Sequence, residues 1–390
     1  MTTTTPLPIV LAGARGHGRW HLANIRRLQD LGVVRLAGIC ELRPLDDEEL
    51  GAFAAEPPLQ SADFGELLDT TGARAAVVCT PIQTHTDLAL TAAGRGVHLL
   101  LEKPPAASWA DFGRIREAVA AAGTACQIGF QSFGSHAVTA VRALVADGAI
   151  GTVRGYGAAG AWVRDEAYYG RAPWAGRRRI DGTDVVDGVL TNPLAHAVAT
   201  ALELADRGTE QDVASVETEL FRAHDIEADD TSCVRITTSD GLPVTASVTL
   251  CAETAAEPYV VVHGDRGRIT FWYKQDRVLL QRAGHGPEES VHGRTDLLEN
   301  LAAHLADGTP LLVPPHRTAA FMRVLEAVRT GPEPTALPAD AWHTEPATGT
   351  TGVRRVVHGI DAAVAAGADT LALYSELGVP WARSREVSAS

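Results

Sequence analysis

One stretch near the start of the chain constrains the fold more than any other. A short apolar run at residues 9–12 leads into a glycine-rich turn at residues 13–18, and residues 20–31 then have the apolar spacing of a helix. This order is typical of a dinucleotide-binding sheet, in which backbone N–H groups and the helix N-terminus face the pyrophosphate. Arg15 stands where the pattern G-x-G-x-x-G has its middle glycine. A plain structural turn is therefore one alternative, and an Arg15 side chain that reaches over the pyrophosphate or adenine is another.

An acidic residue follows the second apolar run. Residues 33–40 predict a strand, and Glu41 comes about where a carboxylate accepts hydrogen bonds from the adenosine ribose. A carboxylate there repels a 2′-phosphate, which favours NAD. Arg43 is the counter-argument, because a guanidinium at this turn could pair with that phosphate. We expect NAD as the cofactor and regard NADP as the less favoured alternative.

Two later strands end in polar turns. Residues 75–79 run into Thr80 and Pro81, and the helix that follows carries His85 in its first turn. Residues 97–101 run into Glu102-Lys103-Pro104. Because parallel strands present their carboxyl ends at the edge where ligands bind, a lysine fixed there offers a positive charge to a hydroxyl that becomes an alkoxide. An ordinary ion pair at the end of a strand is the alternative.

The order of the elements predicts the domain organisation. A helix at residues 109–122 and a strand at residues 125–130 complete an alternating β-α series, which indicates a doubly wound parallel sheet, that is, a Rossmann fold. A chain of 390 residues is too long for one core. We therefore expect an α/β protein with a dinucleotide-binding domain at residues 1–130 and a second, α+β domain at residues 131–390.

The second domain has a different pattern. Long alternating segments predict an open, mainly antiparallel sheet, and Asp240-Gly241 marks a hairpin turn. These segments are residues 153–163, 215–223, 231–238, 243–251, 258–262 and 268–273. One face of such a sheet can be solvated or can pack against a second subunit. We expect this domain to bind substrate and to support a homodimer or homotetramer.

A polar segment between the first two of these strands contains the candidate substrate site. Asn192 and His196 are four residues apart, so we expect them on one face of the first turns of a helix. A satisfied core histidine is the alternative interpretation of His196. Aromatic side chains in the preceding loop suit stacking on a sugar ring, and surface packing is the alternative. Arg178 belongs to an arginine triplet whose favoured interpretation is a solvated face, and an anionic group on the substrate is the alternative. The substrate-binding candidates are Tyr168, Tyr169, Trp174, Arg178 and Asn192.

Composition excludes several classes of function. The net charge of −14 argues against nucleic acid or an anionic membrane as a partner. Five cysteines are scattered without a C-x-x-C pair, which indicates reduced, buried thiols and no metal site. The start of the chain, MTTTTPLP, lacks a basic segment followed by an apolar one. We expect a cytoplasmic protein whose partner is a small molecule.

Taken together, these motifs resemble the Gfo/Idh/MocA family of nicotinamide-dependent oxidoreductases. The resemblance rests on the glycine turn, Glu41, the Thr80-Pro81 turn with His85, the Glu102-Lys103-Pro104 turn and the segment from Gly188 to His196, and it extends to residues 376–381. It implies that Lys103 and His196 flank the nicotinamide and the reacting carbon. The family usually has an aspartate four residues before the histidine, and this chain has Asn192.

The resemblance implies reversible hydride transfer between NAD and a carbinol carbon of a sugar or cyclitol. His196 takes the hydroxyl proton, Lys103 stabilises the alkoxide and Asn192 holds the substrate hydroxyl. The expected cofactor contacts are Gly13, Arg15, Gly16, His17, Gly18, Glu41, Arg43, Thr80, Pro81, His85, Glu102, Lys103 and Gln131. Two alternatives stay open: an enzyme that retains NAD and cleaves glycosides through transient oxidation at C3, and a non-catalytic regulator that binds dinucleotide.

Overall fold

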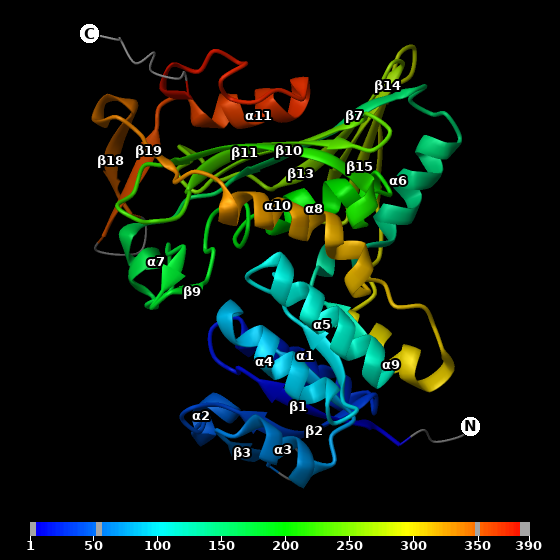
Figure 1. Ribbon diagram of the computed structural model, residues 1–390. Coiled ribbons are helices and arrows are strands. Elements are labelled where there is room, and N and C mark those ends of the chain that lie inside the picture. The colour runs from blue at the N-terminus through cyan, green and yellow to red at the C-terminus, as the bar shows by residue number, and fades with distance from the viewer. Residues whose placement is uncertain (1–4, 52–56, 348–351, 383–390) are drawn as a thin grey trace. The chain divides into compact units, whose positions relative to one another are not determined.

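A computed structural model describes residues 5–51, 57–347 and 352–382, which form two units (Figure 1). Unit 1 contains the residues up to Gln131 together with Thr295–Pro315. Unit 2 contains Ser132–Arg294 and the residues from His316 onward. The sequence analysis did not include the return of the chain to unit 1 at residues 295–315.

Unit 1 is built on a six-stranded sheet in the order β3-β2-β1-β4-β5-β6, and all of its pairings are parallel. The strands are β1 (Leu7–Ala12), β2 (Val34–Cys40), β3 (Leu59–Ser61), β4 (Ala75–Val78), β5 (His98–Leu101) and β6 (Cys126–Ile128). The helices are α1 (Gly18–Asp30), α2 (Asp47–Leu50), α3 (Phe64–Thr71), α4 (His85–Ala93), α5 (Trp109–Ala122) and α9 (Leu297–Asp307). The predicted doubly wound parallel sheet is confirmed.

The returning segment is tied to β6 by a buried amide. The Gln127 side chain donates to Asn300 Oδ1 at 2.6 Å and accepts the Val313 N–H at 2.8 Å. The Ile128 N–H donates to the Val313 carbonyl at 2.9 Å. These bonds satisfy polar groups that would otherwise be buried at the edge of the sheet.

Unit 2 contains a nine-stranded sheet in the order β16-β15-β14-β13-β7-β12-β11-β10-β17. Only the β7–β12 and β10–β17 pairings are parallel, so the expected mainly antiparallel sheet is confirmed. Its strands are β7 (Val153–Ala161), β10 (Val213–Arg222), β11 (Thr231–Thr238), β12 (Pro243–Thr249), β13 (Tyr259–Gly264), β14 (Gly267–Trp272), β15 (Arg277–Arg282), β16 (Glu288–Val291) and β17 (Thr335–Ala336). Two short ladders pair β8 (Arg179–Ile180) with β9 (Thr183–Asp184) and β18 (Trp342–Pro346) with β19 (Val353–Val357).

Helices cover both faces of the central strands of this sheet. The helices of unit 2 are α6 (His136–Ala146), α7 (Glu166–Gly170), α8 (Ala195–Leu204), α10 (Ala319–Thr330) and α11 (Ile360–Thr370). Figure 1 shows α8 and α10 on one side and α11 on the other. The face that the sequence analysis left for solvent or a second subunit is therefore covered at β7 and β12 by the chain's own C-terminal helix. The homodimer or homotetramer stays a prediction.

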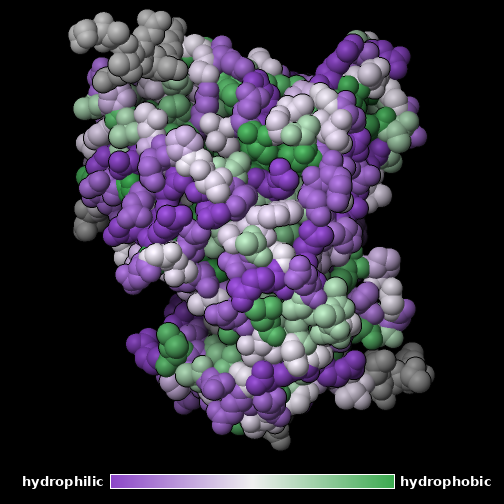
Figure 2. Space-filling view, in the orientation of Figure 1, coloured by the Kyte–Doolittle hydropathy of each residue, from purple (hydrophilic) through white to green (hydrophobic). Residues whose placement is uncertain are grey.

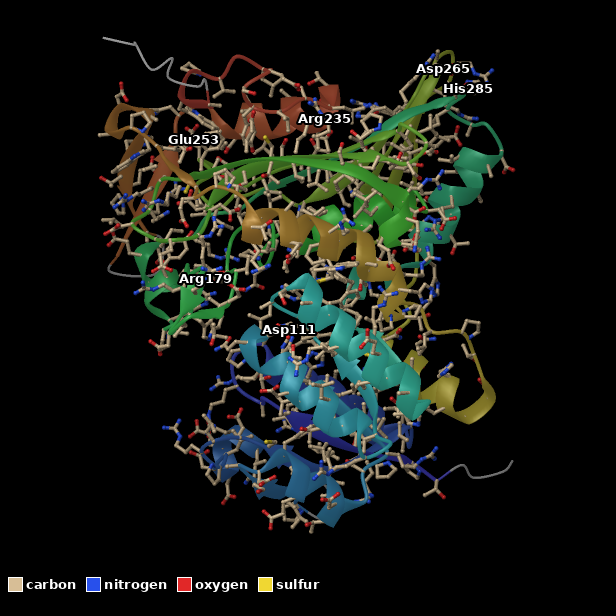
Figure 3. All side chains as sticks on the ribbon, viewed as in Figure 1. Asp111, Arg179, Arg235, Glu253, Asp265 and His285 are labelled. Atoms are coloured by element: carbon tan, nitrogen blue, oxygen red, sulfur yellow. The ribbon has the colours of Figure 1, made fainter. Side chains whose placement is uncertain are left out.

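Close backbone contact fixes α11 to the sheet, and an ion pair fixes the segment that follows this helix. A Cβ on Gly157 would lie 1.9 Å from the Ala368 carbonyl oxygen, which also accepts a bond from His263 Nε2 at 2.9 Å. Arg235, labelled in Figure 3, contacts both carboxylate oxygens of Glu376 at 2.8 Å. The α11 backbone therefore approaches the sheet so closely at residue 157 that only glycine fits there.

The surface of the protein is mainly hydrophilic. Hydrophilic side chains cover most of the face drawn in Figure 2, with hydrophobic residues in small groups between them. Among the described residues, no helix combines the length and the apolar character that crossing a membrane requires.

Replacing Gly157 with valine tests the packing of α11. The new side chain overlaps the Ala368 carbonyl oxygen, so we expect a loss of about 3 kcal/mol in the free energy of unfolding, measured by urea denaturation. Gly170→Ala is the matched control, because a Cβ there meets nothing within 4 Å, and we expect a change within about 0.5 kcal/mol. An equal effect of the two substitutions would contradict the described packing.

Candidate active site

The glycine turn of unit 1 forms a tight cradle between the ends of β1 and β4. Gly13 has φ of +84°, and a Cβ on it would lie 2.4 Å from the Cys79 carbonyl oxygen. A Cβ on Gly18 would lie 2.0 Å from the Gly13 carbonyl oxygen, and Gly16 also has a positive φ. The first turn of α1 contains no acidic residue, so the positive end of the helix dipole can act on a phosphate. This cradle fits the pyrophosphate of a dinucleotide.

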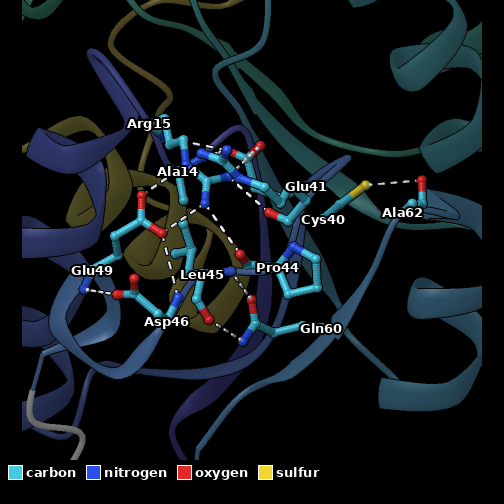
Figure 4. Close-up of polar contacts among 11 residues, drawn as sticks. Ala14, Arg15, Cys40, Glu41, Pro44, Leu45, Asp46, Glu49, Gln60 and Ala62 are labelled. Carbon is cyan, nitrogen blue, oxygen red and sulfur yellow. Dashed lines mark hydrogen bonds and ion pairs between the residues drawn. The ribbon is translucent and has the colours of Figure 1, made fainter.

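Glu41 lies directly beside this turn (Figure 4). Its Oε1 accepts the backbone N–H of Ala14 at 2.6 Å and that of Arg15 at 3.2 Å. The Arg15 guanidinium contacts both carboxylate oxygens of Glu49 at 2.8 and 2.7 Å, and it donates to the Arg43 carbonyl at 2.8 Å. The Arg15 side chain is thus bound to the segment after β2, and the Arg43 side chain is exposed.

Glu102 is a buried carboxylate at the carboxyl end of β5, with an exposed fraction of 4%. Its Oε1 lies 2.9 Å from His21 Nε2 and 3.7 Å from His17 Nε2, and it accepts a bond from Gln131 at 2.8 Å. Burial raises the pKa of Glu102, but the hydrogen bonds from His17 and His21 outweigh it and hold that pKa well below its usual range. Sequence reasoning missed His21. Its position four residues after His17, on the same helix face, was the signal that could have found it.

His85 joins the two polar turns that the sequence analysis selected. Its Nε2 lies 2.9 Å from the Thr80 carbonyl oxygen and its Nδ1 lies 2.9 Å from the Pro104 carbonyl oxygen. Pro81 precedes a short 3₁₀ turn whose Thr84 hydroxyl contacts the Thr80 hydroxyl at 2.6 Å. His85 is buried, and burial lowers its pKa. It positions the turns that carry Thr80 and Lys103.

Lys103 follows Glu102 at the end of β5 and is partly buried. Its backbone N–H donates to Glu102 Oε2 at 3.1 Å, and its peptide bond to Pro104 is cis. The buried carboxylate therefore fixes the backbone of the residue that carries the ammonium group.

The lowered pKa of His85 predicts a pH dependence of stability. Unfolded histidine binds a proton near its usual pKa of 6.5, whereas the buried ring resists it, so its contribution is complete above that pH and is lost as the pH falls below it. We expect the difference in unfolding free energy between the wild type and His85→Gln to shrink between pH 7.5 and 5, by about 1 kcal/mol. Urea denaturation at each pH measures it. A difference that does not change with pH would exclude this role for burial.

In unit 2, a buried turn precedes α8. A Cβ on Gly188 would lie 1.9 Å from Asp229 Oδ1, and the Thr191 hydroxyl donates to the Val186 carbonyl at 2.5 Å. These contacts hold the chain in turns until α8 begins at Ala195. The expectation that Asn192 lies on the first turns of this helix is therefore wrong, because Asn192 lies in the turn before it.

Asn192 has a carboxylate as its neighbour. Its Nδ2 donates to Asp187 Oδ1 at 2.5 Å. Asp187 is buried, and its other oxygen accepts the Gly176 N–H at 2.8 Å and lies 3.4 Å from Arg171. Sequence reasoning missed Asp187, which gives this turn a negative charge although the usual aspartate position holds an asparagine.

His196 occupies the second position of α8 and is partly buried. Its Nδ1 lies 3.2 Å from Ser132 Oγ, which also accepts the Thr200 hydroxyl at 2.8 Å. Its ring stacks near that of Tyr273, with centroids 6.4 Å apart. The Ser132 hydroxyl, another residue that sequence reasoning missed, orients the imidazole.

The aromatic loop before this turn is organised around Arg171. Its guanidinium lies 3.6 Å from the ring centroid of Tyr168 and 4.7 Å from that of Trp174. The Tyr169 ring instead packs against His224, with centroids 4.8 Å apart. Tyr168 and Trp174 are thus brought together, and Tyr169 points to a different neighbour.

The Arg178 side chain binds backbone carbonyls at the end of a helix. Its guanidinium donates to the carbonyls of Val328, Arg329, Gly331 and Pro332, at 3.0 to 3.3 Å. These carbonyls lie at the C-terminal end of α10, where the helix leaves acceptors without partners. Arg178 therefore caps this helix.

Introducing an acid at residue 192 tests the Asp187 contact. In Asn192→Asp, two carboxylates replace an N–H donor and its acceptor, so we expect a loss of about 2 kcal/mol in stability at pH 8. This loss should decrease at pH 5, where one of the two carboxyl groups binds a proton. Asn192→Ala, which adds no charge, should show no such recovery. Thermal unfolding monitored by circular dichroism at both pH values makes the comparison.

Both units match models of one protein family. The model of the Gfo/Idh/MocA oxidoreductase family, NAD-binding Rossmann fold, matches residues 7–130. The model of the Gfo/Idh/MocA C-terminal domain matches residues 138–270.

Curated relatives match over a shorter range. The chain is 28% identical over 121 residues to 4-carboxy-2-hydroxymuconate-6-semialdehyde dehydrogenase of a Sphingobium species, which covers 31% of this chain and 37% of that protein. It is 28% identical over 120 residues to glycosyl hydrolase family 109 protein 2 of Phocaeicola vulgatus, which covers 29% of each. The chain thus spans well under half the length of the curated relatives it matches.

Solved structures share the fold over most of the chain. The WlbA dehydrogenase from Bordetella pertussis, in complex with NADH and UDP-GlcNAcA, has a TM-score of 0.67 at 21% identity and covers 83% of this chain and 95% of its own. The inositol dehydrogenase homolog from Azotobacter vinelandii, complexed with NADH and myo-inositol, has a TM-score of 0.64 at 14% identity, with 84% and 95% covered.

Proposed function

Because the chain belongs to the Gfo/Idh/MocA oxidoreductase family and unit 1 is an NAD-binding Rossmann domain, we propose that it transfers a hydride between NAD(H) and a secondary hydroxyl of a sugar, glycoside or cyclitol. The observation that carries the proposal is the Glu102-Lys103-Pro104 turn, which follows β5 in a domain whose glycine cradle fits a dinucleotide. Two proteins of this fold bind UDP-GlcNAcA and myo-inositol in their crystals, which supports the substrate class.

NAD, when bound, supplies the acceptor and donor of the hydride. The residues suited to hold it are the glycine turn at its pyrophosphate and Glu41 at its adenosine ribose. The second carboxylate oxygen of Glu41 is contacted by the Arg15 guanidinium at 3.4 Å, and its remaining lone pair suits a ribose hydroxyl. Its charge also disfavours a 2′-phosphate, and Arg43 lies exposed beyond it.

Lys103 stabilises the alkoxide in this proposal. Lys103 lies one residue after a buried, ionised carboxylate that accepts its backbone N–H, so this backbone is fixed at the end of β5. A fixed positive charge lowers the energy of a developing negative oxygen most where water is excluded.

His196 takes the hydroxyl proton in this proposal. When its Nδ1–H donates to Ser132 Oγ, the lone pair belongs to Nε2, which can then act as the base. Asn192 holds the substrate hydroxyl, and the Asp187 carboxylate behind it orients the amide. Tyr168 and Trp174, which Arg171 joins, suit the apolar face of a sugar ring.

The test is the absorbance of reduced nicotinamide in the purified full-length protein, with NAD and then NADP, and with a panel of pyranoses, glycosides and inositols. We expect turnover with NAD and a sugar or cyclitol, and a decrease in kcat of about 100-fold or more in Lys103→Met and in His196→Ala.

Lys274→Met is the matched control, because Lys274 is the chain's other lysine and forms an exposed ion pair with Glu257. It should keep the activity of the wild type. Equal turnover by the wild type and both site variants would overturn the assigned roles. Turnover with NADP alone would reverse the interpretation of Glu41.

A second candidate reaction is redox-neutral cleavage of a glycoside, and the similarity to a glycosyl hydrolase family 109 protein favours it. Transient oxidation at C3 acidifies the neighbouring C–H, the aglycone is eliminated, water adds and the hydride returns to C3. Release of aglycone from a chromogenic glycoside without net reduced nicotinamide would identify this reaction. Net reduced nicotinamide in proportion to substrate would identify the dehydrogenase.

A further inference from the structure

Three side chains of different chemistry converge in the interior of unit 2, apart from His196 and Asn192. His224 and Asp230 lie in the connection between β10 and β11, and Cys251 follows β12. His224 Nδ1 lies 2.9 Å from Asp230 Oδ2 and 3.5 Å from Cys251 Sγ. Their exposed fractions are 4%, 0% and 0%. One ligand atom from each residue lies within 4.8 Å of the other two.

Asp230 accepts several hydrogen bonds within this cluster. Besides lying 2.9 Å from His224 Nδ1, its carboxylate accepts the backbone N–H groups of Ala223 and His224 at 2.8 to 3.0 Å. A neutral imidazole nitrogen carries either a proton or a lone pair, so His224 Nδ1 can donate to Asp230 or accept from the Cys251 thiol, but not both. A cation at the common point would contact all three side chains at once.

The distances agree with a tetrahedral metal ion. Zinc lies about 2.0–2.1 Å from a histidine nitrogen and about 2.3 Å from a thiolate, which places these two ligand atoms roughly 3.5 Å apart at a tetrahedral angle. The observed separation of His224 Nδ1 and Cys251 Sγ is 3.5 Å. The Asp230 oxygen needs to move away from the imidazole by only a few tenths of an ångström.

A fourth polar atom lies beside the cluster. Among the described residues, the Tyr169 hydroxyl is buried without a hydrogen-bond partner. The Tyr169 ring packs on His224 at a centroid distance of 4.8 Å. An unpartnered buried oxygen at this position is suited to a fourth ligand.

A cavity lies beside the cluster. Tyr169 lines this cavity of about 550 Å³ in unit 2, and the next residue after His224 along the chain, Asp225, lines it too. Its wall carries the acidic residues Glu227 and Glu333 and the basic residues Arg177 and Arg222. Tyr169 thus borders both this cavity and the His224 ring.

We propose that unit 2 holds one divalent transition metal ion, with Zn²⁺ as the best fit, through His224 Nδ1, Asp230 Oδ2 and Cys251 Sγ, and with Tyr169 Oη at the fourth position. A set of nitrogen, oxygen and sulfur donors favours zinc over magnesium or calcium, which prefer oxygen alone. The ion would tie the connection between β10 and β11 to the end of β12 and to α7. The sequence analysis expected no metal because the three ligands lie far apart in the sequence and form no recognisable spacing.

The test measures metal in the full-length protein, purified without chelator from zinc-supplemented cells. We expect stoichiometric zinc by elemental analysis in the wild type and a decrease of about tenfold or more in Cys251→Ser. Cys233→Ser is the matched control, because Cys233 is equally buried but contacts Glu219 instead of the cluster. Substoichiometric zinc in the wild type, or equal zinc in the two variants, would overturn the proposal.

Cobalt provides a second readout that needs no variant at the cluster. Protein produced with Co²⁺ in place of zinc should show a sulfur-to-cobalt charge-transfer band and the intense ligand-field bands of a tetrahedral site, and Cys233→Ser should keep them. Absence of the charge-transfer band in the wild type overturns the proposal even where Cys251→Ser fails to fold. Neither readout depends on turnover, so the result is independent of the proposed dehydrogenase activity.

Discussion

The buried carboxylate of Glu102 is the interaction on which the rest of unit 1's site depends. A charge with an exposed fraction of 4% is stable inside a protein only when donors surround it. These groups are His21 on α1, His17 just before α1, Gln131 beyond β6 and the Lys103 backbone N–H. One carboxylate thus joins the helix that follows the glycine cradle to the ends of β5 and β6, and it fixes the residue expected to act in catalysis.

In unit 2, buried carboxylates likewise hold the polar turn that precedes α8. Asp187 and Asp229 are buried, and each accepts backbone N–H groups, from Gly176 and from Leu190 respectively. Because these carboxylates determine where the chain turns, α8 begins only at Ala195, and Asn192 is presented from a turn. Sequence spacing alone could not show this, since four residues of separation indicate one helix face only if the helix already exists.

The fold of both units followed from patterns that act locally. In unit 1, apolar runs of four to eight residues that alternate with helical spacing allow little besides a parallel sheet. In unit 2, the pairing of β11 with β12 confirmed the hairpin at Asp240-Gly241. The covered sheet face was not foreseen, because the contact between Gly157 and Ala368 joins residues over 200 positions apart. Nothing in either segment alone reveals the close approach, so the open face was the natural expectation.

The sequence by itself determined the fold class, the family and the residue types at the cofactor cradle, because glycines at tight turns and charges at strand ends are imposed by local geometry. The tertiary structure decided what each polar side chain contacts. It placed Arg15 on Glu49, assigned Arg178 to the end of α10 and brought His224 and Cys251 together. The physical reason is that a buried polar atom takes its partner from whichever element packs against it, and that packing is a property of the whole chain.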